Sequence, residues 1–294
     1  MTATCWMVGG LGRLNVIPLE RQLADLASRS YPAYAALPRS MRSRYDVRET
    51  TVEGCPVLRL TPRSGASGQH LIYAHGGAYV HALVAPQWWF IDRSTRDTGV
   101  TITLPFYRLA PEGGVERGYE LLRTVYAELA AGGSADHITL AGDSSGGGLA
   151  LGQAIAYRDV GAPAPRQIIL LSPWVDITMA NPEIAGLRSR DPMLDLAETL
   201  AFGRLWAGGI DGRHPSVSPL HADLTGLPPV HTFQGGRDIL AADAQLLADR
   251  LQQVGNPGRF TFVPGAFHNY LAAFWTPEAR AALGAVRQLL RPPA

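Results

Sequence analysis

The 294-residue chain contains no lysine, so arginine supplies all 26 of its strongly basic side chains. Without a lysine amine the protein cannot form a side-chain Schiff base, which excludes one large class of covalent catalysis. Cysteine is almost as scarce, because only Cys5 and Cys55 are present. Two cysteines give no disulfide framework, and we expect a protein of the reducing cytoplasm.

Long hydrophobic runs and excess charge are also missing. Although 46% of the residues are hydrophobic, no run reaches the length of a membrane-spanning helix. Residues Met1–Arg13 lack the basic start and the defined apolar segment of a signal peptide. The formal net charge is only +1, so bulk charge does not draw the chain to nucleic acid or anionic lipid. We expect no nucleic-acid partner and no stable membrane insertion.

The most informative stretch that is present runs from Gly142 to Gly146 and has the sequence Gly-Asp-Ser-Ser-Gly. An apolar, β-favouring run at 138–141 precedes it, and a helical pattern at 149–154 follows it. A G-x-S-x-G pattern between a strand and a helix holds its serine on a strained turn with the hydroxyl exposed. The N-terminus of the new helix adds positive potential for an oxyanion. This context predicts that Ser144 is a nucleophile rather than part of an ordinary glycine-rich turn.

Two later segments supply an acid and a histidine in the chain order expected after such a serine. Asp238 comes just after the apolar run 230–233, and His268 comes just after the run 260–263. Reactive groups of open parallel sheets lie at the carboxyl ends of the strands, where we expect both residues. Asp243 is a competing acid, and a helix N-cap is the alternative role for Asp238. Asp238 is favoured because it lies nearer the strand end.

The remaining histidines outside the loop at 75–78 lie in the wrong order or away from a suitable strand end. They are His70, His81, His137, His214, His221 and His231. Upstream, the apolar run 71–74 leads into the sequence His-Gly-Gly-Ala at 75–78, where small residues let backbone N–H groups approach a bound oxygen.

Together these segments resemble the bacterial hormone-sensitive-lipase-like esterases, a branch of the α/β-hydrolase superfamily. The resemblance covers nearly the whole chain from about Tyr45 onward, in order and with sensible spacing. Its further matching segments are Tyr107–Glu112, Ser172–Trp174, Ser218–Leu220 and Gly226–Pro229. It implies a serine carboxylesterase with an α/β-hydrolase fold and neither a metal nor an organic cofactor.

The resemblance also implies a role for each site residue. Ser144 would attack the ester carbonyl, His268 would take and return its proton, and Asp238 would fix the histidine tautomer. The backbone N–H groups expected to hold the oxyanion are those of Gly76, Gly77 and Ser145. The side chains expected only to support the fold or the site are His75, Arg108, Glu112, Asp143 and Asp176.

Several positions depart from the family pattern. Ala78 stands where a third glycine is common, and Ser145 replaces the usual alanine. His81 lies where small residues are frequent, and Asn269 follows the histidine in place of a small residue. None of these changes removes a catalytic atom.

Alternating strand and helix patterns predict an α/β fold with a mostly parallel central sheet, flanked by helices and covered by a small helical cap. We expect an N-terminal helical part of the cap at 1–45 and core segments at 46–178 and 218–294. A second cap insertion is expected at 179–217. Residues Pro18 to Leu37 are expected to form a helix, and another could start at Asp191. Aromatic residues of the insertion, such as Trp206, could line an acyl pocket or simply pack.

The sequence favours a carboxylesterase for short- to medium-chain esters that works through an acyl-enzyme. An aryl-amide deacetylase or amidase with the same triad remains an alternative. A non-catalytic small-molecule receptor is disfavoured, because such relatives typically lose the histidine that His268 retains. The expected partner is a small-molecule ester, and a homodimer is left open.

Overall fold

One eight-stranded sheet runs through the computed structural model, which describes residues 17–28 and 34–293. The strands are β1 (Tyr45–Val52), β2 (Cys55–Pro62), β3 (His70–Ala74), β4 (Thr101–Pro105), β5 (Ile138–Asp143), β6 (Gln167–Leu171), β7 (Val230–Gly235) and β8 (Phe260–Val263). Their spatial order is β1-β2-β4-β3-β5-β6-β7-β8. Only the β1–β2 and β2–β4 pairs are antiparallel, which confirms the predicted, mostly parallel sheet.

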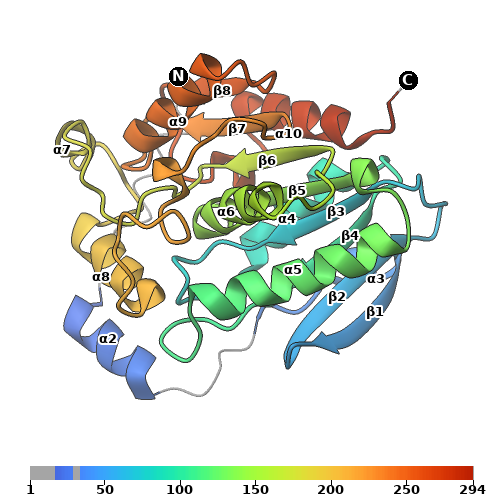
Figure 1. Cartoon of the computed structure of the whole chain (residues 1–294), viewed down its shortest axis with the longest axis horizontal. Coiled ribbons are helices and arrows are strands. Elements are labelled where there is room, and N and C mark those ends of the chain that lie inside the picture. Colours follow the sequence, from blue (N-terminus) through green and yellow to red (C-terminus); the bar gives the residue numbers. More distant parts are fainter. Residues whose placement is uncertain (1–16, 29–33, 294) are drawn as a thin grey trace.

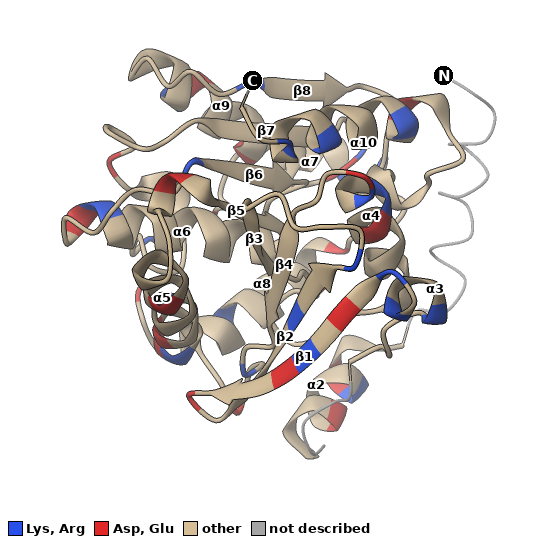
Figure 2. Ribbon diagram, turned by 90° about the vertical axis from the view of Figure 1, so that its right-hand side faces the viewer, with Lys and Arg blue, Asp and Glu red and all other residues tan. Residues whose placement is uncertain are grey.

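The first two strands form a hairpin. Val52 pairs with Cys55, and both residues of the intervening turn, Glu53 and Gly54, have positive φ angles of 49° and 69°. Two left-handed residues match the twist of a tight hairpin. Figure 2 shows both acidic and basic residues along the edge strand β1. Charged side chains on an edge strand discourage pairing with another chain.

Helices cover both faces of the sheet (Figure 1). They are α2 (Leu19–Ser28), α3 (Arg39–Arg42), α4 (Ala85–Thr95), α5 (Val115–Ala131), α6 (Ser145–Asp159), α7 (Ile184–Leu187), α8 (Leu196–Ala207), α9 (Ala241–Gln253) and α10 (Pro277–Leu290). Helices α5, α6 and α9 share a core with Ile168 and Leu170 of β6, whereas α4 and α10 share the opposite core with Ile169 and Leu171. This alternation along one strand is what burial on both faces requires.

A separate layer of helices lies beyond the carboxyl ends of the strands. Helix α2 packs on α8 through Leu26 and Phe202, and the Gln22 Nε2 group donates to Glu198 Oε1 at 2.6 Å. Figure 1 shows α2, α7 and α8 together on one side of the sheet. These contacts join an N-terminal helix to the later insertion.

The helix expected within 18–37 is shorter than predicted. It ends at Ser28, residues 29–33 are outside the described part, and residues 34–38 are not helical. The predictions for Cys5, for Met1–Arg13 and for the start of the cap segment also concern residues outside that part. No helix of the described residues has the length and apolar character needed to cross a bilayer.

The insertion also differs from the sequence prediction in detail. Helix α8 begins at Leu196, where Asp195 caps it by accepting from two backbone N–H groups, and not at Asp191. Trp206 is almost fully buried and stacks on Tyr79 with a centroid separation of 4.2 Å. Trp206 is therefore a packing residue, whereas Phe202 of the same helix lines the cavity that contains Ser144.

Candidate active site

Ser144 lies at a strained turn between a strand and a helix. Its backbone has φ of 53° and ψ of −123°, β5 ends one residue before it, and α6 begins one residue after it. Left-handed backbone is costly for a non-glycine residue and persists only where its surroundings impose it. The turn fits because Gly146 lacks a side chain, since a Cβ there would collide with the carbonyl oxygen of Ala74. The Ser144 N–H is anchored on Leu171 O at 2.9 Å.

His268 and Asp238 form a buried pair at the ends of two other strands. The His268 Nδ1 atom lies 2.8 Å from Asp238 Oδ2, and the Asp238 carboxylate is completely buried. Asp238 also accepts hydrogen bonds from Gln234 Nε2 and from the Leu240 N–H, each at 2.9 Å. These donors fix the carboxylate so that one oxygen faces the imidazole.

The environment of His268 changes its proton affinity in two opposing ways. Burial lowers the pKa of the imidazole, because the charged form loses its hydration. The charge and hydrogen bond of Asp238, together with the smaller effects of Asp191 and Asp143, outweigh burial, and the pKa of His268 is raised above its ordinary value. The site therefore stabilises an imidazolium next to Asp238.

Ser144 and His268 line one cavity of about 410 Å³ beneath the cap. Within the described residues no hydrogen bond joins the Ser144 hydroxyl to His268, whose Nε2 atom lies 3.4 Å from Asn269 Nδ2. Such catalytic hydrogen bonds commonly tighten only when substrate is bound. The cavity thus brings together Ser144, His268 and the loop at 75–78. Asp238 lies behind His268 and bonds to its ring.

The carboxylate of Asp143 organises the surroundings of this cavity. It accepts hydrogen bonds from Tyr73 Oη at 2.5 Å, from the Gly76 N–H at 2.8 Å and from Asn269 Nδ2 at 2.9 Å. The Gln87 amide lies 3.1 Å from both of its oxygens. Asp143 therefore links β3, the loop after β3, α4 and the residue that follows His268. This arrangement agrees with the supporting role expected for it.

The bond to Asp143 changes the expected set of oxyanion donors. The Gly76 N–H is already donated to a carboxylate, so Gly76 does not fit the role expected from the sequence. Within residues 34–293, the N–H groups of Gly77, Ala78 and Ser145 have no recorded acceptor. Gly77 and Ala78 line the cavity, and Ser145 begins α6, whose first N–H groups are unpaired within the helix.

The side chain of His75 stabilises the same loop. Its Nδ1 atom lies 2.8 Å from Gly76 O, and its ring stacks on Tyr107 at a centroid distance of 4.7 Å. The Tyr107 hydroxyl donates to His75 O at 2.8 Å. Burial lowers the pKa of His75, which favours a neutral ring that braces the backbone.

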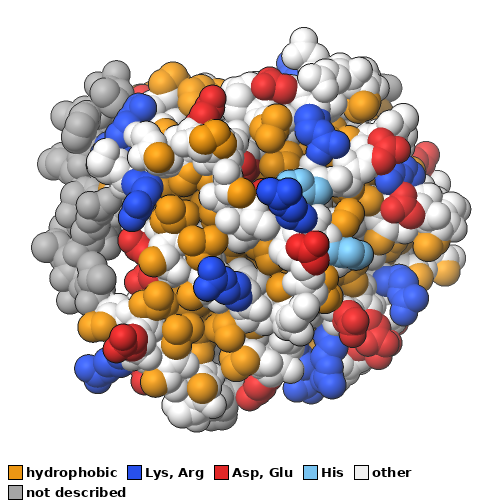
Figure 3. Space-filling model, turned by 60° about the vertical axis from the view of Figure 1, so that its left-hand side comes forward, with side chains coloured by type: hydrophobic (Ala, Val, Ile, Leu, Met, Phe, Trp, Pro, Cys, Tyr) orange, Lys and Arg blue, Asp and Glu red, His pale blue; other side chains and the backbone are white. Residues whose placement is uncertain are grey.

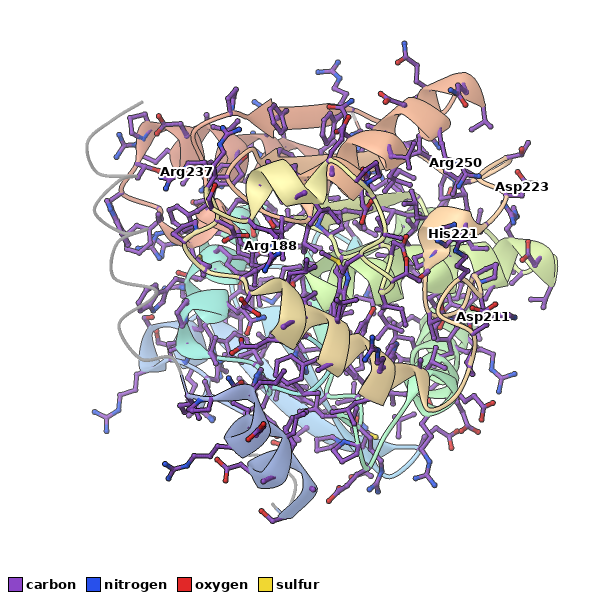
Figure 4. The ribbon with its side chains drawn as sticks, turned by 90° about the vertical axis from the view of Figure 1, so that its left-hand side faces the viewer. Arg188, Asp211, His221, Asp223, Arg237 and Arg250 are labelled. Atoms are coloured by element: carbon purple, nitrogen blue, oxygen red, sulfur yellow. The ribbon has the colours of Figure 1, made fainter. Side chains whose placement is uncertain are left out.

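Two acidic residues lie away from the histidine pair. Asp243, the competing acid, is in the first turn of α9, where burial raises its pKa to about 6. Asp176 accepts from Ser218 Oγ at 3.2 Å and pairs with His221 Nε2 at 3.1 Å. The neighbouring Arg250 donates to backbone carbonyls on either side of His221 (Figure 4). Asp176 therefore supports the loop around His221.

Asp191 ties the cap insertion to the loop that carries Asp238. Its Oδ2 atom accepts from the Ile239 N–H at 2.8 Å, so it bonds to the residue next to the buried acid. Arg237 strengthens the junction by donating from Nε to Arg190 O at 3.2 Å. Figure 4 shows Arg188 and Arg237, which come from these two segments, on the same side of the molecule.

Sequence reasoning missed three of the supporting residues. Asn269 was visible only as a departure from the family pattern, and Asp191 only as a possible helix start. Gln87 carried no signal, because its contact with Asp143 joins positions 56 residues apart. No cluster of three or more His, Cys, Asp or Glu side chains in the described part of the chain is placed to hold a metal ion.

Replacing Asp143 with Asn should lower both stability and activity. The amide offers one acceptor oxygen to donors that now share two, so buried donors lose partners at a cost of about 1–3 kcal/mol of unfolding free energy. A displaced loop should also reduce kcat/KM by about a hundredfold. Urea unfolding and ester hydrolysis measure the two effects. The control Tyr73→Phe loses one donor and should change both less, whereas a wild-type-like Asp143→Asn would contradict the organising role.

Comparison with known proteins agrees with the geometry. A family model of the alpha/beta hydrolase fold matches residues 71–272. An acetyl-hydrolase of Streptomyces hygroscopicus is 34% identical over 82% of this chain and 81% of its own length. An esterase of Acinetobacter venetianus is 29% identical over 77% of this chain and 76% of its own.

Solved structures give the same result over almost the whole chain. An esterase from the bacterial hormone-sensitive lipase family has a TM-score of 0.78 and 26% identity, covering 95% of this chain and 99% of that one. EstE5, soaked by p-nitrophenyl butyrate, has a TM-score of 0.80 and 26% identity, covering 98% and 96%. The chain therefore belongs to the bacterial hormone-sensitive-lipase-like esterases of the α/β-hydrolase superfamily, and it is a carboxylic-ester hydrolase.

Proposed function

We propose that the protein is a serine carboxylesterase that acts on short- to medium-chain esters through an acyl-enzyme. The observation that carries the proposal is the His268–Asp238 pair at 2.8 Å, which shares one cavity with the strained Ser144. A nucleophile, a base and a residue that orients the base are the minimum set for this chemistry.

In the proposed first half-reaction, Ser144 Oγ attacks the ester carbonyl carbon while His268 Nε2 accepts the hydroxyl proton. The tetrahedral intermediate collapses when the carbon–oxygen bond to the alcohol breaks, and the imidazolium returns the proton to the leaving alkoxide. Asp238 keeps the proton on Nδ1 and stabilises the imidazolium. In the second half-reaction water replaces the serine as the attacking group, and the acid and a free Ser144 result.

The oxyanion is proposed to bind the N–H groups of Gly77, Ala78 and Ser145. Their lack of recorded acceptors within the described residues supports this assignment, as does the position of Ser145 at the N-terminus of α6. Removing one such donor typically costs about 3 kcal/mol of transition-state stabilisation. The ability of an enzyme to place these donors before the substrate arrives is what makes them effective.

Size supports a small substrate. A cavity of about 410 Å³ lies toward the lower end of the range for small-molecule sites, and apolar residues such as Phe90 and Phe202 form part of its wall. The acetyl-hydrolase name of the Streptomyces relative agrees with a short acyl group. We also propose a cytoplasmic location, which rests on the scarcity of cysteine in the sequence.

Hydrolysis of p-nitrophenyl acetate, butyrate, octanoate and palmitate tests the proposal. Wild type should turn over the shorter esters fastest, and Ser144→Ala should lose at least about 10⁴-fold in kcat because no nucleophile remains. The control Ser43→Ala changes an exposed serine and should remain active. An active Ser144→Ala, or a clear preference for emulsified long-chain esters, would contradict the proposal.

The pH dependence tests the role of His268 separately. Only the neutral imidazole can accept the serine proton, so kcat/KM should fall as pH drops through the pKa of the free enzyme. Because Asp238 raises that pKa against the effect of burial, the midpoint should lie above about 6.5. Asp238→Asn should lower the midpoint and reduce kcat by on the order of 10⁴. A flat profile between about pH 5 and 8 would exclude His268 as the base.

A further inference from the structure

One face of the cap helix α8 lines the substrate cavity. Asp195, at the N-cap of the helix, and Glu198, Thr199 and Phe202 within it all contribute to the wall. Their spacing of three, four and seven residues places them on one side of a helix. Two carboxylates lie at the N-terminal end of this face, and Glu198 is the one that contacts α2. Figure 3 brings the α2 and α8 side of the molecule forward and shows isolated charges among many hydrophobic side chains.

The charged side chains of the described cavity wall are predominantly acidic. No arginine contributes to it, and its ionisable side chains outside the catalytic pair are Asp143, Asp195, Glu198 and His81. The oxygens of Asp143 are occupied by the donors described above, and Asp195 Oδ1 accepts from the N–H groups at the start of α8. Asp195 and Glu198 thus each keep one oxygen for a ligand, but Asp195 is exposed, whereas Glu198 is half-buried and is the one held by a neighbouring helix.

Glu198 is also held in position. Its Oε1 atom accepts from Gln22 Nε2 at 2.6 Å, and no partner is recorded for Oε2 among residues 17–28 and 34–293. The side chain is half-buried between two cap helices, where a fixed carboxylate interacts with a charge more strongly than in bulk water. One oxygen therefore anchors the group, and the other is left for an incoming donor.

We infer that Glu198 determines which substrate charge the esterase prefers. Esters that carry an ammonium or similar cationic group are preferred over neutral esters of the same shape. This inference rests on the proposed function. The cation would be in the part of the ester that extends from Ser144 toward α8. An anionic group in the same place would meet a like charge, and no arginine among the described lining residues compensates it, so such esters are disfavoured.

A purely structural role for Glu198 makes a different prediction. If the carboxylate only tethers α8 to α2, its charge is unimportant and the loss of the tether is what matters. Glu198→Gln separates the two cases, because the amide oxygen can still accept from Gln22 while the negative charge is gone. Gln22→Ala is the converse variant, since it removes the tether and keeps the charge.

Acetylthiocholine and 3,3-dimethylbutyl thioacetate provide the test, because carbon replaces the quaternary nitrogen without a change of shape. The measured quantity is the ratio of kcat/KM for the cationic to the neutral thioester at about pH 8, where an ordinary histidine is neutral. Wild type should give a ratio above one, which should fall by about threefold to thirtyfold in Glu198→Gln. Added salt should reduce the wild-type ratio, because it screens a partly exposed pair.

The controls decide between the outcomes. Gln22→Ala should retain a ratio above one, and so should Glu183→Gln, which changes an exposed glutamate outside the cavity. A wild-type ratio of one or less, or a ratio unchanged in Glu198→Gln, would overturn the inference while hydrolysis of the neutral thioester still supported the proposed function. A wild type that hydrolyses neither thioester nor any p-nitrophenyl ester would overturn both.

Discussion

The buried carboxylate of Asp143 holds the catalytic surroundings together. Its two oxygens receive donors from Tyr73, Gly76, Gln87 and Asn269, which belong to four different segments. A buried carboxylate persists only when hydrogen bonds replace its lost hydration, and each of these donors would itself be costly to leave unpaired. The strained serine turn, the loop at 75–78 and the histidine loop therefore share one electrostatic anchor.

This anchor explains how the loop at 75–78 is prepared for an oxyanion. The N–H of Gly76 is used internally, and the chain then turns through Gly77, whose φ of 132° suits only glycine. The N–H groups of Gly77 and Ala78 have no acceptor among the described residues, whereas the Tyr79 N–H donates to Ser145 Oγ. The bond to Asp143 thus removes Gly76 from the N–H groups of this loop that could face an oxyanion.

Much of the architecture could be predicted from the sequence, because its signals are local. The strand–turn–helix around Ser144, the hairpin at Glu53 and the chain order of the acid and histidine all follow from short patterns. Other contacts depend on how distant segments approach each other in three dimensions. They are the bonds of Gly76 and Gln87 to Asp143 and the bond of Asp191 to the residue after Asp238. The start of α8 at Leu196 was missed because Asp191 accepts from the nearby N–H groups of Met193 and Leu194 without starting a helix, and its second oxygen accepts from the distant Ile239 N–H.

Covalent labelling tests the central claim, the nucleophilic role of Ser144, most directly. The protein is incubated with diethyl p-nitrophenyl phosphate, digested and analysed by mass spectrometry. We expect one diethylphosphoryl group on Ser144, with loss of activity in proportion to labelling and much slower labelling in a His268→Ala variant. An inactivated protein that carries the group on another residue, or a protein that stays unlabelled while it hydrolyses esters, would contradict the account.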